Sequence, residues 1–100
     1  MSKSLFTVRG KKHAKHPQII VDANKTKFKS VTLTHDPGKT KHWNKPLTKN
    51  PNKKDKKKAY YSKQVIEDFK FNFTKAYKKY HLSNDDIKAM ITFLENKIKK

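Results

Sequence analysis

The chain of 100 residues contains no cysteine, and its apolar residues are few and form only short runs. The missing thiols exclude a disulfide framework, a thiolate nucleophile and a cysteine-based zinc site, and they fit a reducing cytoplasm. Because no apolar run exceeds a few residues and the first ten lack a signal-peptide core, we expect neither a membrane span nor a secretion signal. Only 33% of the residues are hydrophobic, which predicts a single domain with a small core. Without a membrane span, a secretion signal or cysteine, we expect this domain in the cytoplasm.

Acidic residues are also scarce, with 8 against 26 basic residues and a formal net charge of +18. Residues 1–59 carry 17 basic and 3 acidic side chains, whereas residues 60–100 carry 9 and 5. Almost all of the excess is lysine, a hydrated point charge that suits phosphate backbones better than base edges. Binding of a polyanion is therefore the first functional prediction, with a merely solvated lysine surface and an acidic protein partner as alternatives.

Composition divides the single domain, residues 1–100, into four segments. Residues 1–35 contain the strand-like runs "SLFTV", "QIIVD" and "KSVTLT" and are predicted to hold a β-hairpin. Residues 36–58 contain three of the four prolines and many lysines, which is typical of a long basic loop, either a mobile binding element or partly disordered. Residues 59–81 are predicted to form a strand and turn region, and residues 82–100 a helix. The expected class is mainly β with a C-terminal helix (α+β).

The C-terminal helix has a clear start signal and one apolar stripe. Ser83 can cap the first turn, and Asp86 three residues later makes a variant of the capping box. Acidic residues in the first turn and lysines in the last suit the helix dipole. The stripe follows the i, i+3, i+4 spacing of a face that packs on a sheet, and it consists of Ile87, Met90, Ile91, Leu94 and Ile98.

The stretch "HPQIIVDANKTKFKSVTLTHD", residues 16–36, is predicted to fold back as an antiparallel hairpin with its turn around residues 25–27. Pairing Ile19 with Leu33 puts the apolar side chains of both strands on one face. This register places His16 opposite Asp36, and it gathers His16, Thr34 and Asp36 at the open end, away from the core. His35 falls nominally on the core face, although a twist or bulge at the strand end can re-aim it.

The open end of the hairpin supplies the candidate catalytic residues His16, Thr34, His35 and Asp36. A histidine can take a proton from a ribose 2′-hydroxyl or give one to a leaving 5′-oxygen, and a carboxylate such as Asp36 can orient it. Lysines or Arg9 can stabilise charge on the phosphate oxygens. Such cleavage needs no metal and no cofactor, and "KKHAKH" is a poor metal motif because cations flank its histidines. The alternative is that these are ordinary polar residues at strand ends.

Aromatic residues elsewhere leave several possibilities open. Trp43 can stack on a base or pin the long loop to the domain. Phe69, Phe71 and Phe73 alternate with polar residues, which predicts a strand whose apolar face serves the core or a dimer, with base stacking as the alternative. Residues 77–80 are expected to form a turn or short helix. The run "NKKDKKK", residues 52–58, is either a solvated charge run or a phosphate clamp.

Four segments resemble, in order, the landmarks of the MazF/PemK-like toxins of bacterial toxin–antitoxin pairs: "KHPQIIVD", "VTLTHD", "DKKKAYYSKQVIEDF" and "KKYHLSNDDIKAMITFLENKI". In that family an arginine–proline or similar pair leads into an apolar strand, and a threonine-centred element ends the next strand. His16 and Pro17 stand at the first of these places here, and Thr34, followed by His35, stands at the second. The resemblance covers most of the chain through short motifs.

The resemblance implies a small SH3-like antiparallel β-barrel with a packed helix, usually a homodimer. It also implies a toxin that cleaves single-stranded RNA without metal by 2′-hydroxyl attack, and an acidic antitoxin protein that neutralises it. The family's usual arginine is replaced by His16, so Arg9, Lys12 or Lys15 would supply its charge, or cleavage is lost and RNA binding kept. The residues expected to bind RNA are Arg9, Lys11, Lys12, Lys15, Lys39, Lys41 and Trp43.

Two other functions stay open beside the ribonuclease. The first is a non-catalytic, basic nucleic-acid-binding protein that serves a mobile element as an accessory or regulator. The missing arginine before Pro17 favours it. The second is a ribosome-associated protein, which suits the lysine content but leaves the paired histidines without a role.

Overall fold

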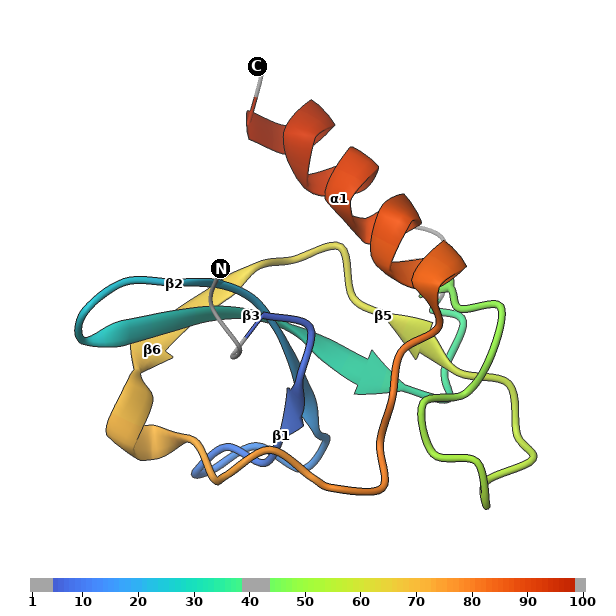
Figure 1. The fold of residues 1–100 in the computed structure, drawn as a ribbon, viewed down its shortest axis with the longest axis horizontal. Helices are drawn as coiled ribbons and strands as arrows, with labels where there is room; N and C mark the ends of the chain where they lie inside the picture. Colours follow the sequence, from blue (N-terminus) through green and yellow to red (C-terminus); the bar gives the residue numbers. More distant parts are fainter. Residues whose placement is uncertain (1–4, 39–43, 99–100) are drawn as a thin grey trace.

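The structure is a computed structural model that describes residues 5–38 and 44–98. Its elements are β1 (Val8–Arg9), β2 (Gln18–Ala23), β3 (Lys27–Thr34), β4 (Lys45–Pro46), β5 (Tyr60–Tyr61), β6 (Ile66–Phe69), the 3₁₀-helix η1 (Lys70–Asn72) and α1 (Asn84–Ile98). The fold is mainly an antiparallel sheet with one C-terminal helix, as predicted (Figure 1). Within the described ranges, no helix is long and apolar enough to span a membrane.

The sheet is organised around β3, the longest strand. One edge of β3 pairs with β2, and β1 pairs with the far edge of β2. The other edge is shared: residues 27–30 pair with β6, and residues 33–34 pair with β5, to which β4 is added. Strand β3 therefore joins β6 at its first half to β5 and β4 at its last residues.

The predicted hairpin of β2 and β3 forms, but its predicted register is wrong by two residues. Ile19 pairs with Val31 rather than with Leu33, and an irregularity at Val21 changes the register by one residue nearer the turn, where Asp22 pairs with Lys29. The turn is fixed by the Asn24 side chain, whose Oδ1 accepts the N–H groups of residues 26 and 27 at 2.9 and 2.8 Å. A shift of two residues keeps each side chain on its face. The expected apolar face is therefore present, with Ile19, Val21, Val31 and Leu33 in one core cluster.

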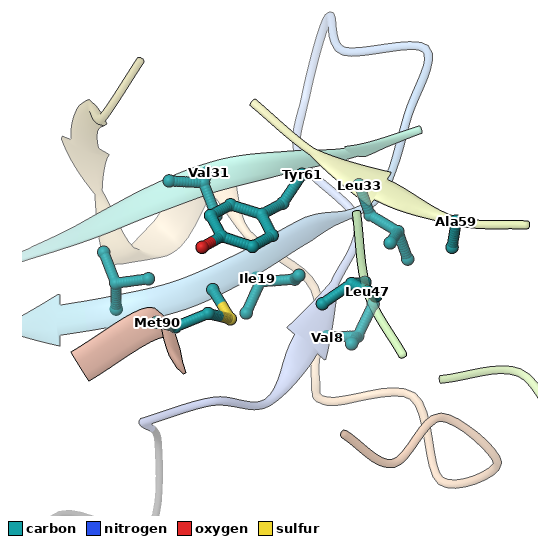
Figure 2. Close-up of a cluster of buried hydrophobic side chains, with 9 residues drawn as sticks. Val8, Ile19, Val31, Leu33, Leu47, Ala59, Tyr61 and Met90 are labelled. Carbon is teal, nitrogen blue, oxygen red and sulfur yellow. The ribbon is translucent and has the colours of Figure 1, made fainter. Parts of the chain in front are cut away.

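The core lies between this sheet and the first half of α1 (Figure 2). The predicted N-cap is confirmed, because Ser83 Oγ accepts the Asp86 N–H at 3.2 Å. Met90 of the apolar stripe is fully buried, whereas Ile91 is 42% exposed. The buried cluster consists of Val8, Ile19, Val21, Val31, Leu33, Leu47, Ala59, Tyr61 and Met90.

Asp86 connects α1 to the segment that was predicted to be a long basic loop. Its buried carboxylate accepts the backbone N–H groups of Thr48 at 2.8 Å and Lys49 at 3.3 Å. Burial, and then the charge of Asp86, raises the pKa of the neighbouring Tyr61 to about 12. Leu47 and Pro51 are also buried. From residue 44 onward the segment is thus tied to the core.

The predicted strand over residues 69–73 is wrong, because β6 ends at Phe69 and η1 follows. The cause is Asp68, whose Oδ1 accepts the Phe69 N–H at 2.7 Å and the Asn72 Nδ2 at 2.9 Å. Such local side-chain bonds compete with a sheet ladder. Phe73 packs edge-on against Phe28, with ring centroids 5.3 Å apart. The predicted turn at residues 77–80 is present, with a backbone hydrogen bond closing it.

Residues 8–12 lie beside residues 72–77 along the edge of β1 that faces away from β2 (Figure 1). Backbone hydrogen bonds join residue 12 to 72 at 2.8 Å, residue 74 to 10 at 2.9 Å and residue 77 to 8 at 2.8 Å. Gly10 permits this approach, since a Cβ there would lie 2.5 Å from the Tyr77 hydroxyl and 3.2 Å from Thr74 Cγ2. We refer to this contact as the seam.

Candidate functional site

The ends of β2 and β3 bring His16 and Thr34 together. Both line a hollow of about 420 Å³ that Asp36 also lines. Both also line a smaller one of about 100 Å³, shared with His35 and Asp55. The four predicted catalytic residues therefore gather around Thr34, with Asp36 on one side of it and His35 on the other.

His35 is held by a carboxylate that the sequence analysis did not pair with it. Its Nε2 lies 2.5 Å from Asp55 Oδ2. Hydrogen bonds from the Lys57 N–H and then from His35 lower the pKa of Asp55, so this carboxylate is ionised at neutral pH. An ionised carboxylate only accepts hydrogen bonds, which assigns the ring proton to Nε2. In the neutral form of His35 the lone pair is then on Nδ1, for which the described residues show no hydrogen-bond partner, and it can take a proton from a ligand.

Asp36, which was expected to orient His16, instead shapes the turn after β3. Its Oδ1 accepts the Gly38 N–H at 2.8 Å, and its own N–H donates to Thr34 Oγ1 at 3.1 Å. Gly38 has a positive φ of 82°, which this turn requires. Among the residues described, the His16 ring has no hydrogen-bond partner. The carboxylate–histidine pair of this site is therefore Asp55 with His35, not Asp36 with His16.

Gln18 fixes the backbone that carries His16. Its side chain is 2% exposed. Its Oε1 accepts the Ser30 hydroxyl at 2.9 Å, and its Nε2 donates to Thr32 Oγ1 at 3.1 Å and to the His16 carbonyl at 3.3 Å. A buried amide with all these partners has one favourable orientation. Gln18 is therefore a positioning residue for the end of the hairpin.

Residues 11–15 form a basic turn that leads to His16. The Ala14 N–H donates to the Lys11 carbonyl at 3.1 Å, and His13 adopts a left-handed φ of 64°. Such a conformation in a non-glycine residue costs about 1 kcal/mol or more and is common near functional sites. Lys12 and Lys15 are exposed, and both line a hollow of about 410 Å³ together with His16 and Phe71.

Two of the cations expected to bind RNA are committed to the fold. Lys11 Nζ forms an ion pair with Asp68 Oδ2 at 2.9 Å, and bonds from Lys11 and then Asn72 lower the pKa of Asp68 to about 2. Arg9 donates to Thr7 Oγ1 at 3.1 Å and to the carbonyl of residue 74 at 3.2 Å, and its guanidinium lies 5.0 Å from the Phe28 ring centre. Burial lowers the pKa of Arg9. Lys12 and Lys15 remain for a ligand.

The remaining predicted binding residues, Lys39, Lys41 and Trp43, lie outside the residues that the structure describes. Across the described ranges, no three histidine or acidic side chains gather where they could hold a metal ion.

Sequence reasoning missed Asp55 and Gln18. The available signal for Asp55 was its place as the one carboxylate in "NKKDKKK". For Gln18 it was a polar residue at the start of an otherwise apolar strand.

No relative was found from which a function could be transferred to the site. No protein-family model, no curated protein and no solved structure matches this chain.

Proposed function

We propose that the chain is a toxin-like endoribonuclease that cleaves single-stranded RNA without a metal ion. The observation that carries the proposal is the His35–Asp55 contact beside His16 and Thr34 in one hollow. Two histidines and a carboxylate are a sufficient set of acid–base groups for transfer of a phosphoryl group to a ribose 2′-hydroxyl. The net charge of +18 supports an RNA substrate.

In the proposed reaction, His35 Nδ1 removes the proton of a ribose 2′-hydroxyl, and Asp55 stabilises the imidazolium that forms. The 2′-oxygen attacks the adjacent phosphorus, and the bond from phosphorus to the 5′-oxygen breaks. Protonated His16 gives its proton to that oxygen. The products are a 2′,3′-cyclic phosphate and a 5′-hydroxyl, with one proton taken and one given. The Thr34 hydroxyl can donate to a phosphate oxygen as its charge grows.

The proposal includes an SH3-like barrel of the MazF/PemK kind. The seam supports it, because its hydrogen bonds link β1 to the segment that follows β6, at the far side of the sheet. It also includes a homodimer and an acidic antitoxin protein that occupies the basic surface. A short neighbouring gene for an acidic protein that blocks the activity would support this last part.

The decisive experiment is incubation of the purified protein with a long single-stranded RNA in excess EDTA. Wild type should give discrete fragments ending in a cyclic phosphate, and the His16→Ala/His35→Ala variant should give none while still binding RNA. The matched control is His13→Ala/His81→Ala, which removes two exposed histidines that do not line the hollow. Cleavage that persists in the first variant, or is lost equally in the control, would refute the assignment.

A second function, binding of nucleic acid without cleavage, is favoured by the placement of Arg9. This residue is the only arginine, and it is held by Thr7, the carbonyl of Thr74 and the Phe28 ring instead of lining the hollow. Charge at the scissile phosphate would then come from lysine alone. RNA that stays intact in EDTA and in magnesium, yet shifts on a native gel, would select this function.

A further inference from the structure

The surface at η1 carries two phenylalanine rings that the proposed reaction does not use. Phe69 is 43% exposed and Phe71 is 72% exposed. Their ring centroids are 5.2 Å apart and their planes differ by 7°, so the rings are stacked in parallel. Phe69 covers one face of Phe71, and the large exposure of Phe71 leaves its other face to solvent. A flat aromatic face is thus presented outward.

This stacked pair is fixed in place by the fold. Asp68 holds the turn of η1 through the Phe69 N–H and the Asn72 side chain, and it is itself held by Lys11. The seam anchors the other end of η1, where the Lys12 N–H donates to the Asn72 carbonyl at 2.8 Å. A ring that is already oriented loses little freedom when a ligand stacks on it.

Positive charge surrounds the pair. Lys27 Nζ lies 5.0 Å from the centre of the Phe69 ring. Phe71 itself lines the 410 Å³ hollow whose other side chains include Lys12, Lys15 and His16. The exposed ring, a proposed catalytic histidine and two lysines without an ion-pair partner among the described residues therefore line one depression. Aromatic faces interleaved with lysines favour a ligand that combines π-faces with negative charge, which describes single-stranded nucleic acid.

We propose that Phe71, supported from below by Phe69, is a base-stacking platform for single-stranded RNA. One unpaired base rests on Phe71, and Lys12 and Lys15 hold the phosphates between this base and the scissile phosphate at His16. This inference rests on the proposed function and adds to it a subsite that selects unpaired over paired RNA, since a base within a duplex has no free face. A hydrophobic protein segment is the competing occupant, and the lysines around the ring disfavour it.

The test is the affinity of Phe71→Ala for a fluorescent single-stranded 2′-O-methyl RNA, which lacks the attacking hydroxyl and stays intact. Loss of one stacked base should weaken binding about 5- to 150-fold. The slope of log affinity against log salt should stay unchanged, because no phosphate contact is removed. Phe71→Trp, which keeps a flat aromatic ring at this position, should restore the affinity. The matched control Ile91→Ala, another exposed apolar residue, should bind as wild type.

The outcomes separate the platform from the function beneath it. If wild type binds the oligonucleotide and Phe71→Ala binds it equally well, the platform is refuted and the ribonuclease proposal stands. If Phe71→Ala weakens binding of duplex RNA as much as of the single strand, or if Phe71→Trp fails to restore affinity, the ring is structural and the platform is also refuted. If wild type neither binds nor cleaves RNA, both proposals fall.

Discussion

Two lysine-rich segments, residues 11–16 and 52–58, have similar compositions but are held in different ways. The first segment is held by a carboxylate from another part of the chain, since Asp68 of β6 binds Lys11. Lys12 and Lys15 of this segment are exposed. In the second, the carboxylate lies inside the run, and Asp55 binds His35 at the end of β3. The first segment thus places the exposed Lys12 and Lys15 beside Phe71. The second supplies Asp55, which orients His35.

The difference shows that in a strongly basic chain the few carboxylates assign the roles. A composition of 26 basic and 8 acidic residues cannot indicate which lysines meet a ligand. A carboxylate that binds a cationic side chain makes that cation unavailable to RNA, as Asp68 does for Lys11. We expect the contrast between the two segments to appear in the measurements below, from the largest effect to the smallest.

The largest effect is expected when Asp55, the carboxylate of the second segment, is replaced by alanine, with Asp68→Ala as the comparison. Asp55→Ala removes the group that orients His35 and should lower the cleavage rate about 100-fold, a typical contribution of one acid–base element. Asp68→Ala loosens η1 and releases Lys11, so it can weaken RNA binding, but it should leave the cleavage rate at saturating RNA within about 2-fold of wild type, since general acid–base catalysis does not involve it. Initial rates on a quenched fluorescent RNA in EDTA measure both. Equal losses would show that the two segments are not functionally distinct.

A stability effect is expected from the contact that holds the second segment to α1. Asp86→Ala leaves the N–H groups of Thr48 and Lys49 without their acceptor in a partly buried place and should lower the free energy of unfolding by about 1–3 kcal/mol. Asp85→Ala, at the exposed neighbouring position in the same first turn, should cost less than about 1 kcal/mol. Urea unfolding followed by circular dichroism gives both values. A larger loss in Asp85→Ala than in Asp86→Ala contradicts the anchoring role.

The salt dependence of RNA binding should differ between the two segments. Lys12→Ala/Lys15→Ala removes two proposed phosphate contacts and should reduce the slope of log affinity against log salt by about 1.4, at about 0.7 per contact for a single strand. Lys53→Ala/Lys54→Ala removes the same charge from the second segment and should change the slope much less. Titrations with 2′-O-methyl RNA at several salt concentrations decide this. Identical slopes in the two variants would favour a diffuse charge effect.

The smallest effect is the acid sensitivity that Asp68 confers. Its pKa is lowered in the fold from 3.8 to about 2. A carboxyl group with a depressed folded-state pKa stabilises the protein above its unfolded pKa, and this stability is lost as pH falls toward the folded value. The melting temperature of wild type should therefore exceed that of Asp68→Asn by a constant small amount above about pH 5, and the gap should close toward about pH 2. A gap that widens with acid would reverse the assignment.

The helix and the apolar face of the hairpin could be predicted because both depend on local signals. Ser83 begins α1 through its own hydroxyl, and the apolar side chains at positions 19, 21, 31 and 33 stay together in one core cluster despite a register shift of two residues. The register itself could not be predicted, since the Asn24 turn and the irregularity at Val21 set it. The end of the strand at Phe69 depends on the Asp68 side chain, which carries no strong local signal.

The location of the candidate site could be predicted from the sequence, but the carboxylate that binds its histidine could not. His16 and Thr34 lie close together because both stand at the open end of the β2–β3 hairpin. Asp55 reaches His35 across 20 residues of chain, and only the tertiary fold brings them together. Arg9 was expected to be a phosphate ligand, and its bond to the carbonyl of residue 74 likewise depends on the tertiary fold, through the seam.

The seam also has a consequence for how the protein is made. Gly10 and Thr74 are 64 residues apart in the sequence, so the ribosome must add 64 residues after Gly10 before the two can meet. Contacts of such long range form late and slow the folding of small domains. A nascent chain that has reached Phe71 still lacks the residues that close the depression around it. The surroundings of Phe71 can therefore form only after residues 72–77 have been made, and a chain that stops at Phe71 would lack both the seam and the completed depression.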